Sequence, residues 1–520
     1  MKQAQEARGA TLLALLAAIV WLAATAWIRP LAVPDEGRYI GVAWEMLRSG
    51  DWLTPTLDGL PYFHKPPLFY WITAASLHVL GPSEFAGRMA SLIGASFAAI
   101  ALYLFARRRL GAGTARGALL ALVTQPLFFI GAQFANLDML VAGCIAVTIL
   151  ALADCALSAG LRERRASLAI AYLFAALGVL AKGLIGAVLP ALVIAVWLLL
   201  QRRVRSLLQL IWLPGIVLFF CVAAPWFVAM QARFPDFSHY FFVVQHFQRF
   251  AEGGFNNVQP FWFFPAALAL LALPWTAWLL GSGRAAYWSH PQRGAIRSLM
   301  WVWLATITAF FTLPQSKLVG YIFPVLPALA WLAADAAEAL IERRPVYRRL
   351  WRFSGGLAGA ACIAAAVGAA MLVAHPQRDL GRVLRARLAP GDQVVYLGDY
   401  YFALEFYAHL RSPVVVVANW ESAEARRDNW RKELLDASKF AANSTSLIAP
   451  QALGARLCAS VPSWVVGGRG ASHEYSLLAR AEQVATSGNL VLWRVPPVPA
   501  GAVSVPGCPG TPSANSIDKS

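Results

Sequence analysis

Two adjacent carboxylates, Asp35 and Glu36, follow directly on the first long apolar segment of the chain. Charged side chains are costly to place against lipid, so we do not expect an acid pair at a membrane exit to be a passive surface feature. Lys65 lies further along, inside an aromatic and proline-rich run at residues 62–67, and brings a cation to the same side of the membrane. An acid pair and a lysine at one membrane surface predict chemistry on an anionic substrate that the membrane holds.

Composition places the chain among polytopic α-helical membrane proteins. Of its 520 residues, 58% are hydrophobic and only 14% are charged, whereas ordinary globular domains carry about 25% charged residues. Many stretches reach the roughly 20 apolar residues that a helix needs to cross a bilayer. The first of them, near residues 11–28, lacks a small-residue cleavage site followed by soluble sequence. We therefore interpret it as a retained span and not as a removed signal peptide.

The net charge of +17 comes largely from arginine clusters in alternate short loops. Cytoplasmic loops are enriched in Lys and Arg, so this pattern indicates topology and contacts with anionic lipid, and it argues against nucleic-acid binding. In a bacterial inner membrane it places the N-terminus in the cytoplasm and the tail beyond residue 375 in the periplasm. About eleven spans are predicted, near residues 11–30, 84–106, 115–134, 137–158, 167–182, 183–200, 207–229, 261–281, 297–313, 318–338 and 353–375.

Lysine usage supports this topology independently. Between residues 3 and 431 the only lysines are Lys65, Lys182 and Lys317, and the predicted topology places all three at the outer face, opposite the arginine clusters. A lysine is a flexible point charge that suits phosphate. The three could therefore surround one anion site. The alternative is that each lysine extends to its own membrane interface.

The outer loops hold the remaining polar candidates. Apolar residues recur at nearly helical spacing over residues 35–48, which predicts an amphipathic helix on the membrane with Arg38 one turn from Asp35. A second such helix is predicted from Pro67 to Leu80. Asp138 falls at an outer turn, where a helix N-cap is the competing interpretation.

Two later outer loops add further candidates. Arg249 lies among aromatic residues that follow Gln245 and His246, and it could hold a phosphate or anchor the interface. Tyr321 follows Lys317 in the last outer turn, where prolines break the helix and leave polar backbone exposed near a cavity.

The tail is predicted to be a small periplasmic α/β domain over residues 376–496, after a membrane domain over residues 1–375. Residues 497–520 are rich in Pro, Gly, Ala and Ser and are predicted to be disordered. Cys458 and Cys508 could form a disulfide there, although their spacing alone does not show it. The strands are expected near residues 393–397, 413–417, 446–448, 464–466 and 490–495, and the helices near 400–410, 420–440 and 450–459.

The motifs over residues 10–375 resemble, in their order, those of the bacterial aminoarabinose transferases. That family belongs with the protein O-mannosyltransferases among the GT-C type of glycosyltransferases. The motifs that carry the resemblance lie at residues 35–39, 50–55, 62–67, 181–183 and 246–250, and at Ser316-Lys317 with Tyr321.

The resemblance implies an enzyme that takes a sugar from a polyprenyl phosphate donor to a periplasm-facing acceptor, lipid A phosphate in the aminoarabinose family. By motif matching, Asp35 resembles the essential acid, with Glu36 and Asp138 as further acidic candidates. The family commonly has Glu at the positions of His64 and Gln245, and both changes remove negative charge. The residues implied in donor and phosphate binding are Arg38, Lys65, Lys182, Arg249, Lys317 and Tyr321.

No cofactor follows from the sequence with confidence. It shows no zinc spacing, Walker loop or dinucleotide-binding fingerprint. A divalent metal would be compatible with the resemblance, with His64 and His246 as the available ligands. Because the carrier linkage itself supplies the energy, no nucleotide site is required.

The residue types fit transfer chemistry. Cleavage of a sugar–phosphate bond passes through an oxocarbenium-like state while negative charge builds on the phosphate. Lysine and arginine can neutralise that charge, and a carboxylate can stabilise the cationic sugar or accept a proton. Two alternatives remain open: an O-glycosyltransferase acting on protein or glycan hydroxyls, and a transporter or flippase for a lipid-linked sugar. A transporter would place its polar residues near the bilayer midplane, whereas here the candidates collect at one face.

Overall fold

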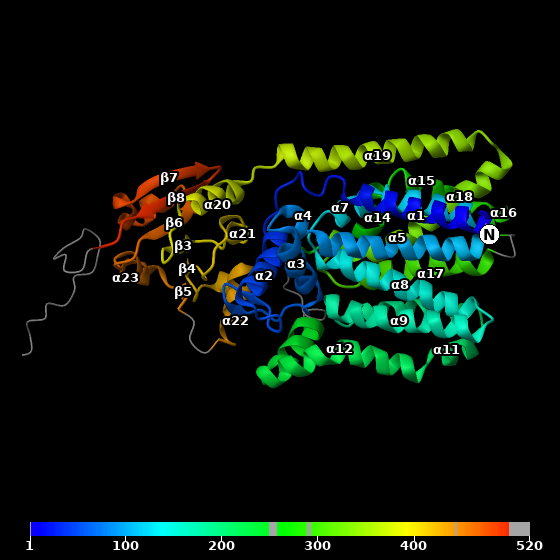
Figure 1. The fold of residues 1–520 in the computed structure, drawn as a ribbon, viewed down its shortest axis with the longest axis horizontal. Helices are drawn as coiled ribbons and strands as arrows, with labels where there is room; N and C mark the ends of the chain where they lie inside the picture. Colours follow the sequence, from blue (N-terminus) through cyan, green and yellow to red (C-terminus); the bar gives the residue numbers. More distant parts are fainter. Residues whose placement is uncertain (1, 249–256, 289–292, 442–444, 499–520) are drawn as a thin grey trace, which may run out of the picture. The chain divides into compact units, whose positions relative to one another are not determined.

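A computed structural model describes residues 2–248, 257–288, 293–441 and 445–498. It consists of two compact units (Figure 1). The first, called the membrane unit, comprises Met1–Arg29, Trp52–Thr54 and Phe63–Leu372. The second, called the sheet unit, comprises Pro30–Asp51, Pro55–Tyr62 and Val373–Ser520.

The membrane unit is a bundle of long apolar helices. Among the described residues, eight helices are long and apolar enough to cross a bilayer, and two bent helix pairs bring the number to ten if each pair is one span. The bent pairs are α6 Ala112–Val123 with α7 Pro126–Ala132, at 69°, and α14 Phe263–Leu271 with the segment Trp275–Gly283, at 99°. The eight helices are α1 Lys2–Ala23, α5 Met89–Leu110, α8 Leu137–Leu157, α9 Leu161–Lys182, α12 Leu213–Arg233, α17 Gly294–Thr312, η3 Val319–Val325 continued by α18 Leu326–Arg343, and α19 Tyr347–Leu372.

The predicted break between residues 182 and 183 is confirmed. Gly183 ends α9 with a φ of +88°, a conformation that glycine adopts without strain. The following helix, α10 Ile185–Leu200, has 16 residues and is therefore only about 24 Å long. It is apolar but shorter than the helices that qualify as spans, which is why the structure has fewer full-length spans than predicted.

Small residues bring the central helices close together. α5, α8 and α9 lie side by side (Figure 1). A Cβ added to Gly143 of α8 would lie 2.1 Å from the carbonyl oxygen of Gly94 in α5. A Cβ on Gly186 of α10 would lie 2.2 Å from the carbonyl carbon of Gly178 in α9. Such close backbone contact is the usual way in which helices associate inside a membrane.

Short helices connect the long ones. The predicted helix from Pro67 to Leu80 is confirmed as α3 Leu68–Leu80, with Pro67 at its N-cap. Cys144, Cys155, Cys221 and Cys362 are free thiols on long helices. The other short helices are α4 Glu84–Gly87, α11 Val204–Leu210, the π-helix η1 His239–Gln248, α15 Trp275–Trp278, η2 Leu279–Gly283 and α16 Ala285–Trp288.

The sheet unit contains a six-stranded mixed sheet with the order β5-β4-β3-β6-β8-β7. Neighbours from β5 to β6 are parallel, and β8 joins β6 and β7 in antiparallel pairs. Buried aliphatic and aromatic side chains, among them Val395, Val465 and Trp493, form its core. The strands are β3 Gln393–Leu397, β4 Val415–Val417, β5 Leu447–Ile448, β6 Ser463–Gly468, β7 Glu482–Ser487 and β8 Leu490–Val495.

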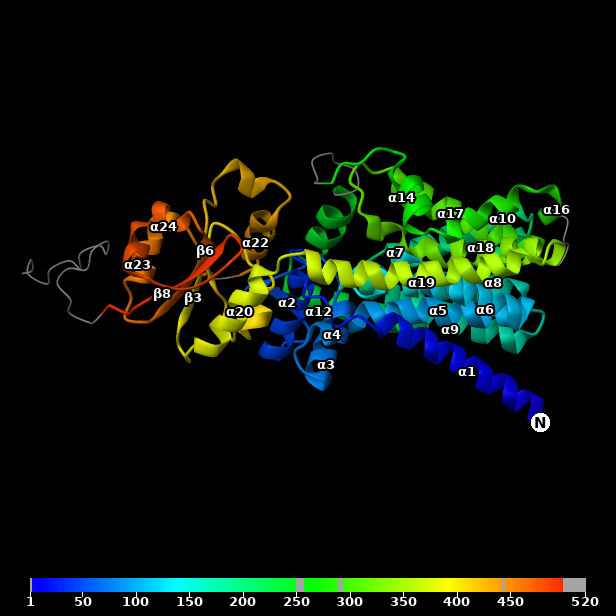
Figure 2. The same cartoon turned by 90° about the horizontal axis from the view of Figure 1, so that it is seen from above.

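The predicted α/β character of the tail is confirmed, and the structure adds elements that were not predicted, among them the short helices α24 Ala471–Glu474 and η6 Ser476–Arg480. The edge strand β7 and the helix α20 Pro376–Arg387, which packs on β7 and β8 (Figure 2), were not predicted. Cys458 is disulfide-bonded, whereas Cys508 and the predicted disordered residues from 499 onward lie outside the described residues. The remaining helices are α21 Leu404–Ala408, η4 Ala423–Arg426, α22 Trp430–Ser438, η5 Pro450–Ala452 and α23 Leu453–Leu457.

The helix that carries the acid pair belongs to the sheet unit. It is α2 Asp35–Ser49, and the hairpin of β1 Thr56–Leu57 and β2 Leu60–Pro61 follows it. A Cβ on Gly37 would lie 2.8 Å from the Ala403 nitrogen, so α2 packs directly on the backbone just before α21. The Trp44 indole donates to the carbonyl of Leu410 at 3.2 Å. The amphipathic helix predicted over residues 35–48 is therefore confirmed as α2, and one side of it packs against the tail.

Candidate active site

In the membrane unit, Asp138, Lys182 and Tyr321 form one cluster. The Lys182 ammonium donates to the Asp138 carboxylate, and the Lys182 and Asp138 side chains are only 13% and 19% exposed. The ammonium also lies 4.5 Å from the centroid of the Tyr321 ring. Residues that are far apart in the sequence thus hold one largely buried cation between an acid and an aromatic face.

Asp138 can pair with Lys182 because another residue, Asn136, caps the helix that carries Asp138. The Asn136 side chain accepts from the Met139 amide at 2.8 Å and is the N-cap of α8. The alternative interpretation of Asp138 as the N-cap is therefore wrong. A Cβ on Gly320 would lie 3.1 Å from the Asp138 Oδ2, so the glycine before Tyr321 gives the carboxylate its room.

His64 and Gln245, the two positions at which the sequence was expected to depart from the motifs that it resembles, lie on one hydrogen-bonded chain. The Tyr240 hydroxyl lies 2.9 Å from the His64 Nε2, and the Gln245 amide donates to the same hydroxyl at 2.9 Å. His64 is 7% exposed and Lys65, the next residue, is half-buried. The two departures from the family pattern therefore coincide in space, next to the predicted phosphate-binding lysine.

Lys317 has different partners from Lys182. Its ammonium donates to the carbonyls of Gln259 at 2.9 Å and Gln315 at 3.4 Å. The Lys317 backbone amide donates to the carbonyl of Asn257 at 3.0 Å, and Lys317 is 4% exposed. In this structure Lys317 fastens two loop segments together, which resembles a structural role more than phosphate binding.

The arginine-rich loops lie at the opposite end of the membrane unit. Arg109, in the last turn of α5, donates to Asp154 at 2.8 Å, and Arg203, before α11, donates to the Ala156 carbonyl at 2.8 Å. Asp138 and Asp154 are both on α8, about 24 Å apart along the helix axis. The cluster of Asp138 and the arginine-rich end are therefore separated by most of a bilayer's thickness.

In the sheet unit, Asp35 and Arg38 form a second cluster with Glu433. The Arg38 guanidinium bridges the carboxylates of Asp35, on its own helix, and Glu433, on α22. It also lies 5.7 Å from the centroid of the Phe402 ring. The Asp35 side chain is 48% exposed. An exposed carboxylate with a held arginine beside it is suited to meet a polar ligand.

Glu36 is placed differently from Asp35. It is fully buried, and its Oε2 accepts from the Ala32 amide at 2.7 Å. This hydrogen bond fixes the chain as it enters α2. The geometry favours Asp35 as the reacting acid, although the roles of both residues stay predictions.

A buried group of carboxylates lies further along the same unit, and it was not predicted. Glu45 accepts from the Asp58 and Gly59 amides at 2.6 and 2.9 Å and so holds the β1–β2 turn. Tyr400 donates to Glu405. Burial, together with the nearby Glu45 charge, raises the pKa of Glu405 to about 8. Glu45 and Glu405 are each 2% exposed. Their hydrogen bonds are internal to the sheet unit, so we interpret both as structural residues.

Two predicted residues cannot be placed. Arg249 lies outside the described residues, and so does the side chain of His246. In the part of the chain that the structure describes, no three His, Cys, Asp or Glu side chains are grouped to hold a metal ion. His64, the other predicted ligand, has its Nε2 within hydrogen-bond distance of Tyr240. The described residues therefore do not fit a metal centre.

Sequence reasoning found most of the candidate site residues and missed Glu433, the partner of Arg38, and Tyr240, the partner of His64. Glu433 lies 395 positions from Arg38, and Tyr240 lies 176 positions from His64. Glu433 lies in an ordinary charged helix, and Tyr240 lies among several aromatic residues. Neither carries a local signal that would have marked it.

Comparison with known proteins finds one matching family and several similar relatives. Residues 64–228 match the family described as dolichyl-phosphate-mannose-protein mannosyltransferase. The undecaprenyl phosphate-alpha-4-amino-4-deoxy-L-arabinose arabinosyl transferase of Aeromonas salmonicida is 32% identical over 67% of this chain and 63% of its own length. The enzyme of the same name from Pseudomonas aeruginosa is 35% identical over 60% of this chain and 56% of its own. The chain thus spans somewhat less than two thirds of these relatives.

A solved structure extends the similarity to the whole fold. The crystal structure of ArnT from Cupriavidus metallidurans bound to undecaprenyl phosphate superposes with a TM-score of 0.78. The match covers 94% of this chain and 98% of that chain, at 24% sequence identity. At this identity the similarity concerns the fold alone. The chain therefore shares the fold of this structure, and over 60–67% of its length it is similar in sequence to the undecaprenyl phosphate-aminoarabinose arabinosyl transferases.

Proposed function

We propose that this protein is a glycosyltransferase that moves a sugar from an undecaprenyl-type phosphate carrier to an acceptor at the outer face of the inner membrane. The proposed acceptor is a lipid A phosphate. The observation that carries the proposal is the largely buried Asp138–Lys182–Tyr321 cluster at one end of the bundle, opposite the arginine-rich loops.

The cluster suits the donor phosphate. Lys182 is held in place by Asp138 and by the Tyr321 ring, so little conformational freedom is lost when the ammonium meets an anion. Lys65 would supply a second point charge. Negative charge grows on the phosphate as the sugar leaves, and a cation fixed in a low-dielectric site stabilises that state more than the ground state.

Asp35 is proposed to act on the sugar side. Its carboxylate is half-exposed and oriented by Arg38, which is in turn held by Glu433. A carboxylate so placed can stabilise an oxocarbenium-like sugar or bind an amine on it. A lipid A phosphate is already ionised and needs no general base, so these roles would suffice for that acceptor.

The proposal includes an orientation. The arginine-rich end would face the cytoplasm, as the positive-inside tendency requires, and the N-terminus would lie there too. The Lys182 end would face the periplasm, and the tail beyond residue 375 is expected there from the topology. Single-cysteine labelling with an impermeant reagent, at Lys182 and at Arg205 in a background without native thiols, tests it. Labelling of the Lys182 position only after the cytoplasmic side is opened would overturn the orientation.

The names of the relatives support the proposed donor. Two relatives at 32% and 35% identity are named undecaprenyl phosphate-aminoarabinose arabinosyl transferases. Their sugar is cationic, whereas His64 and Gln245 replace acids that are common in the family. Aminoarabinose is therefore the first donor to test, with a neutral hexose or pentose on the same carrier as the comparison.

The test is a transfer assay with purified full-length protein in detergent. Undecaprenyl phosphate-aminoarabinose and lipid A are supplied, and mass spectrometry detects a lipid A that carries one added sugar. The matched control is Lys182→Gln, which keeps the side chain's polarity and removes its charge. A transporter would make no covalent product in detergent. A sugar found only on a protein or glycan hydroxyl would replace lipid A by an O-glycosylation acceptor.

A further inference from the structure

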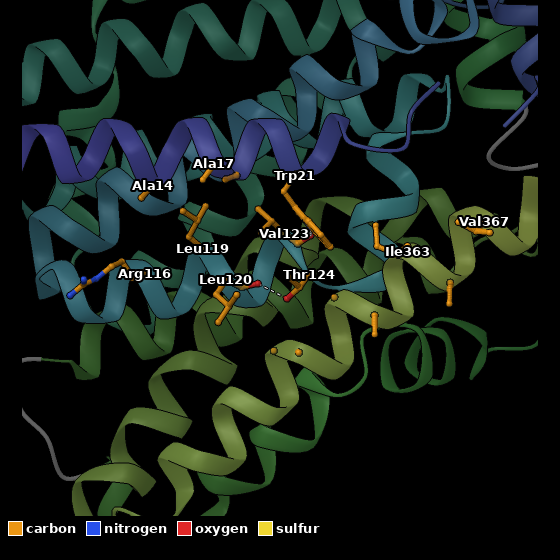
Figure 3. Close-up of a pocket in the computed structure, with 16 residues that line it drawn as sticks. Ala14, Ala17, Trp21, Arg116, Leu119, Leu120, Val123, Thr124, Ile363 and Val367 are labelled. Atoms are coloured by element: carbon orange, nitrogen blue, oxygen red, sulfur yellow. Dashed lines mark hydrogen bonds between the residues drawn. The ribbon is translucent and has the colours of Figure 1, made fainter. Parts of the chain in front are cut away.

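A long apolar groove runs between α1, α6 and α19 in the membrane unit (Figure 3). Its volume is about 980 Å³, at the upper end of the roughly 300–1,000 Å³ that small-molecule pockets occupy. Ala14 and Ala17 line it from α1, and Gly356, Gly359 and Ile363 line it from α19. Along α19 it extends from Gly355 to Val367, which is about 18 Å of helix.

The groove is open because glycines, which have no side chain, line it on α19. A Cβ added to Gly356 would meet no atom within 4 Å, and one added to Gly359 would meet only the Trp21 ring, at 3.7 Å. Glycine in membrane helices usually permits close backbone contact, as Gly143 and Gly94 do between α8 and α5. Here the glycines face open space instead, so helix packing does not account for them.

One end of the groove is cationic. Arg116 of α6 lines that end (Figure 3), and its Nε donates to the carbonyl of Ala112 at 3.2 Å. Arg352 lies one turn before Gly356 on the same face of α19. Both guanidinium groups are exposed, and no carboxylate in the described part of the chain pairs with either. By contrast Arg109, at the end of the preceding helix α5, is paired with Asp154.

From this geometry we propose that the groove binds an anionic glycerophospholipid from the leaflet next to the arginine-rich loops. One acyl chain would lie along the glycines of α19, and the phosphate would contact Arg116 and Arg352. The groove's length of about 18 Å is close to half of the roughly 30 Å hydrocarbon core, which is the depth that one acyl chain spans. Arg116 at its polar end, with Arg352 one turn before Gly356 on α19, would select an anionic headgroup.

The polyprenyl phosphate carrier fits this groove less well than an anionic glycerophospholipid does. Its phosphate belongs at the Lys182 end in the proposed function. Arg116 lies in the first turns of α6, and Arg109 lies at the end of the preceding helix α5. Arg109 pairs with Asp154, which is about 24 Å from Asp138 along α8. The lipid site is therefore distinct from the proposed donor site, and its existence does not depend on the proposed transfer reaction.

The decisive variant is Gly356→Leu, which fills the groove where the structure leaves room. Its matched control is Gly368→Leu, on the same helix, where an added Cβ also meets no atom within 4 Å and which does not line the groove. The full chain, purified in detergent, is titrated with phosphatidylglycerol, and bound lipid is counted by native mass spectrometry. Gly356→Leu should lose one tightly bound lipid that the wild type and Gly368→Leu keep.

The headgroup is tested with Arg116→Gln and Arg352→Gln. Each should weaken phosphatidylglycerol binding about fivefold, because one juxtamembrane arginine contributes about 1 kcal/mol toward an anionic lipid. Arg205→Gln, at an exposed position on α11, is the control and should leave binding unchanged.

Three outcomes would overturn the proposal. Unchanged lipid binding in Gly356→Leu would place the lipid elsewhere. Equal binding of phosphatidylcholine would remove the role of the arginines. Displacement of the bound lipid by equimolar undecaprenyl phosphate would assign the groove to the carrier. All three are independent of whether the protein transfers a sugar.

Discussion

Lys182→Gln should lower both the stability of the protein and its transfer rate, because it breaks the ion pair with Asp138. Both side chains are more than four-fifths buried, so removing one charge leaves the other uncompensated. Breaking such a pair costs about 3–5 kcal/mol of stability. Because each partner keeps some exposure, we expect the lower end, about 3 kcal/mol. Asp138→Asn should cost a similar amount.

The double variant Asp138→Asn/Lys182→Gln separates the catalytic from the structural role of this ion pair. Removing both charges leaves no unpaired ion, so the free energy of unfolding should recover most of its loss. Transfer should not recover. Loss of one preorganised charge at a developing anion lowers the rate by about 10²–10³-fold, or about 2.7–4 kcal/mol.

The assay measures thermal unfolding and transfer on the same detergent preparations, with rates normalised to folded protein. Arg109→Gln/Asp154→Asn is the control, because this pair lies at the arginine-rich end of α8. It should change stability without changing the normalised rate. If the double variant at the Lys182 end recovered both stability and transfer, the pair would be structural and the proposed phosphate role would be refuted.

Three further predictions concern other residues. Asp35→Asn should abolish transfer and leave carrier binding intact, whereas Glu36→Gln should mainly lower thermal stability; near-normal turnover in Asp35→Asn would move the acid elsewhere. Lys65→Ala should weaken donor binding and slow transfer together, and Lys65→Arg should rescue only partly; donor affinity equal to wild type, measured by calorimetry, would leave Lys65 as an interface anchor. Because burial raises the pKa of Glu405 from 4.5 to about 8, the folded chain keeps a proton that the unfolded chain loses, so stability should fall as pH rises between those values. Glu405→Gln should flatten that fall in pH-dependent unfolding, and an unchanged slope would show that Glu405 ionises normally.

Much of the architecture is a local property of the sequence. The length of an apolar stretch determines whether a helix can cross a bilayer, and a glycine at position 183 can adopt the φ of +88° with which α9 ends. The helices α2 and α3, most strands of the tail and the grouping of arginines at one end of the bundle could be predicted for this reason. β7 could not, because an edge strand of polar residues such as Glu482–Ser487 lacks the apolar pattern of a buried strand.

The candidate site was predictable as a set of residue types and not as a set of contacts. The sequence, through its family motifs, indicated Asp35, Lys65 and Asp138 as functional. It could not show that Lys182 pairs with Asp138 while Lys317 binds backbone carbonyls. The three lysines look equivalent in the sequence, and only the packing of their helices gives them different partners.

The sequence by itself determined that this is a multi-span membrane protein with acids and lysines predicted at one face, because hydropathy and charge are carried by individual residues. The tertiary structure decided that α2 packs on the tail, that Glu433 holds Arg38 and that glycines of α19 open a groove beside α1. Such contacts join positions hundreds of residues apart. They depend on which surfaces meet after the chain has folded, and no local pattern encodes that.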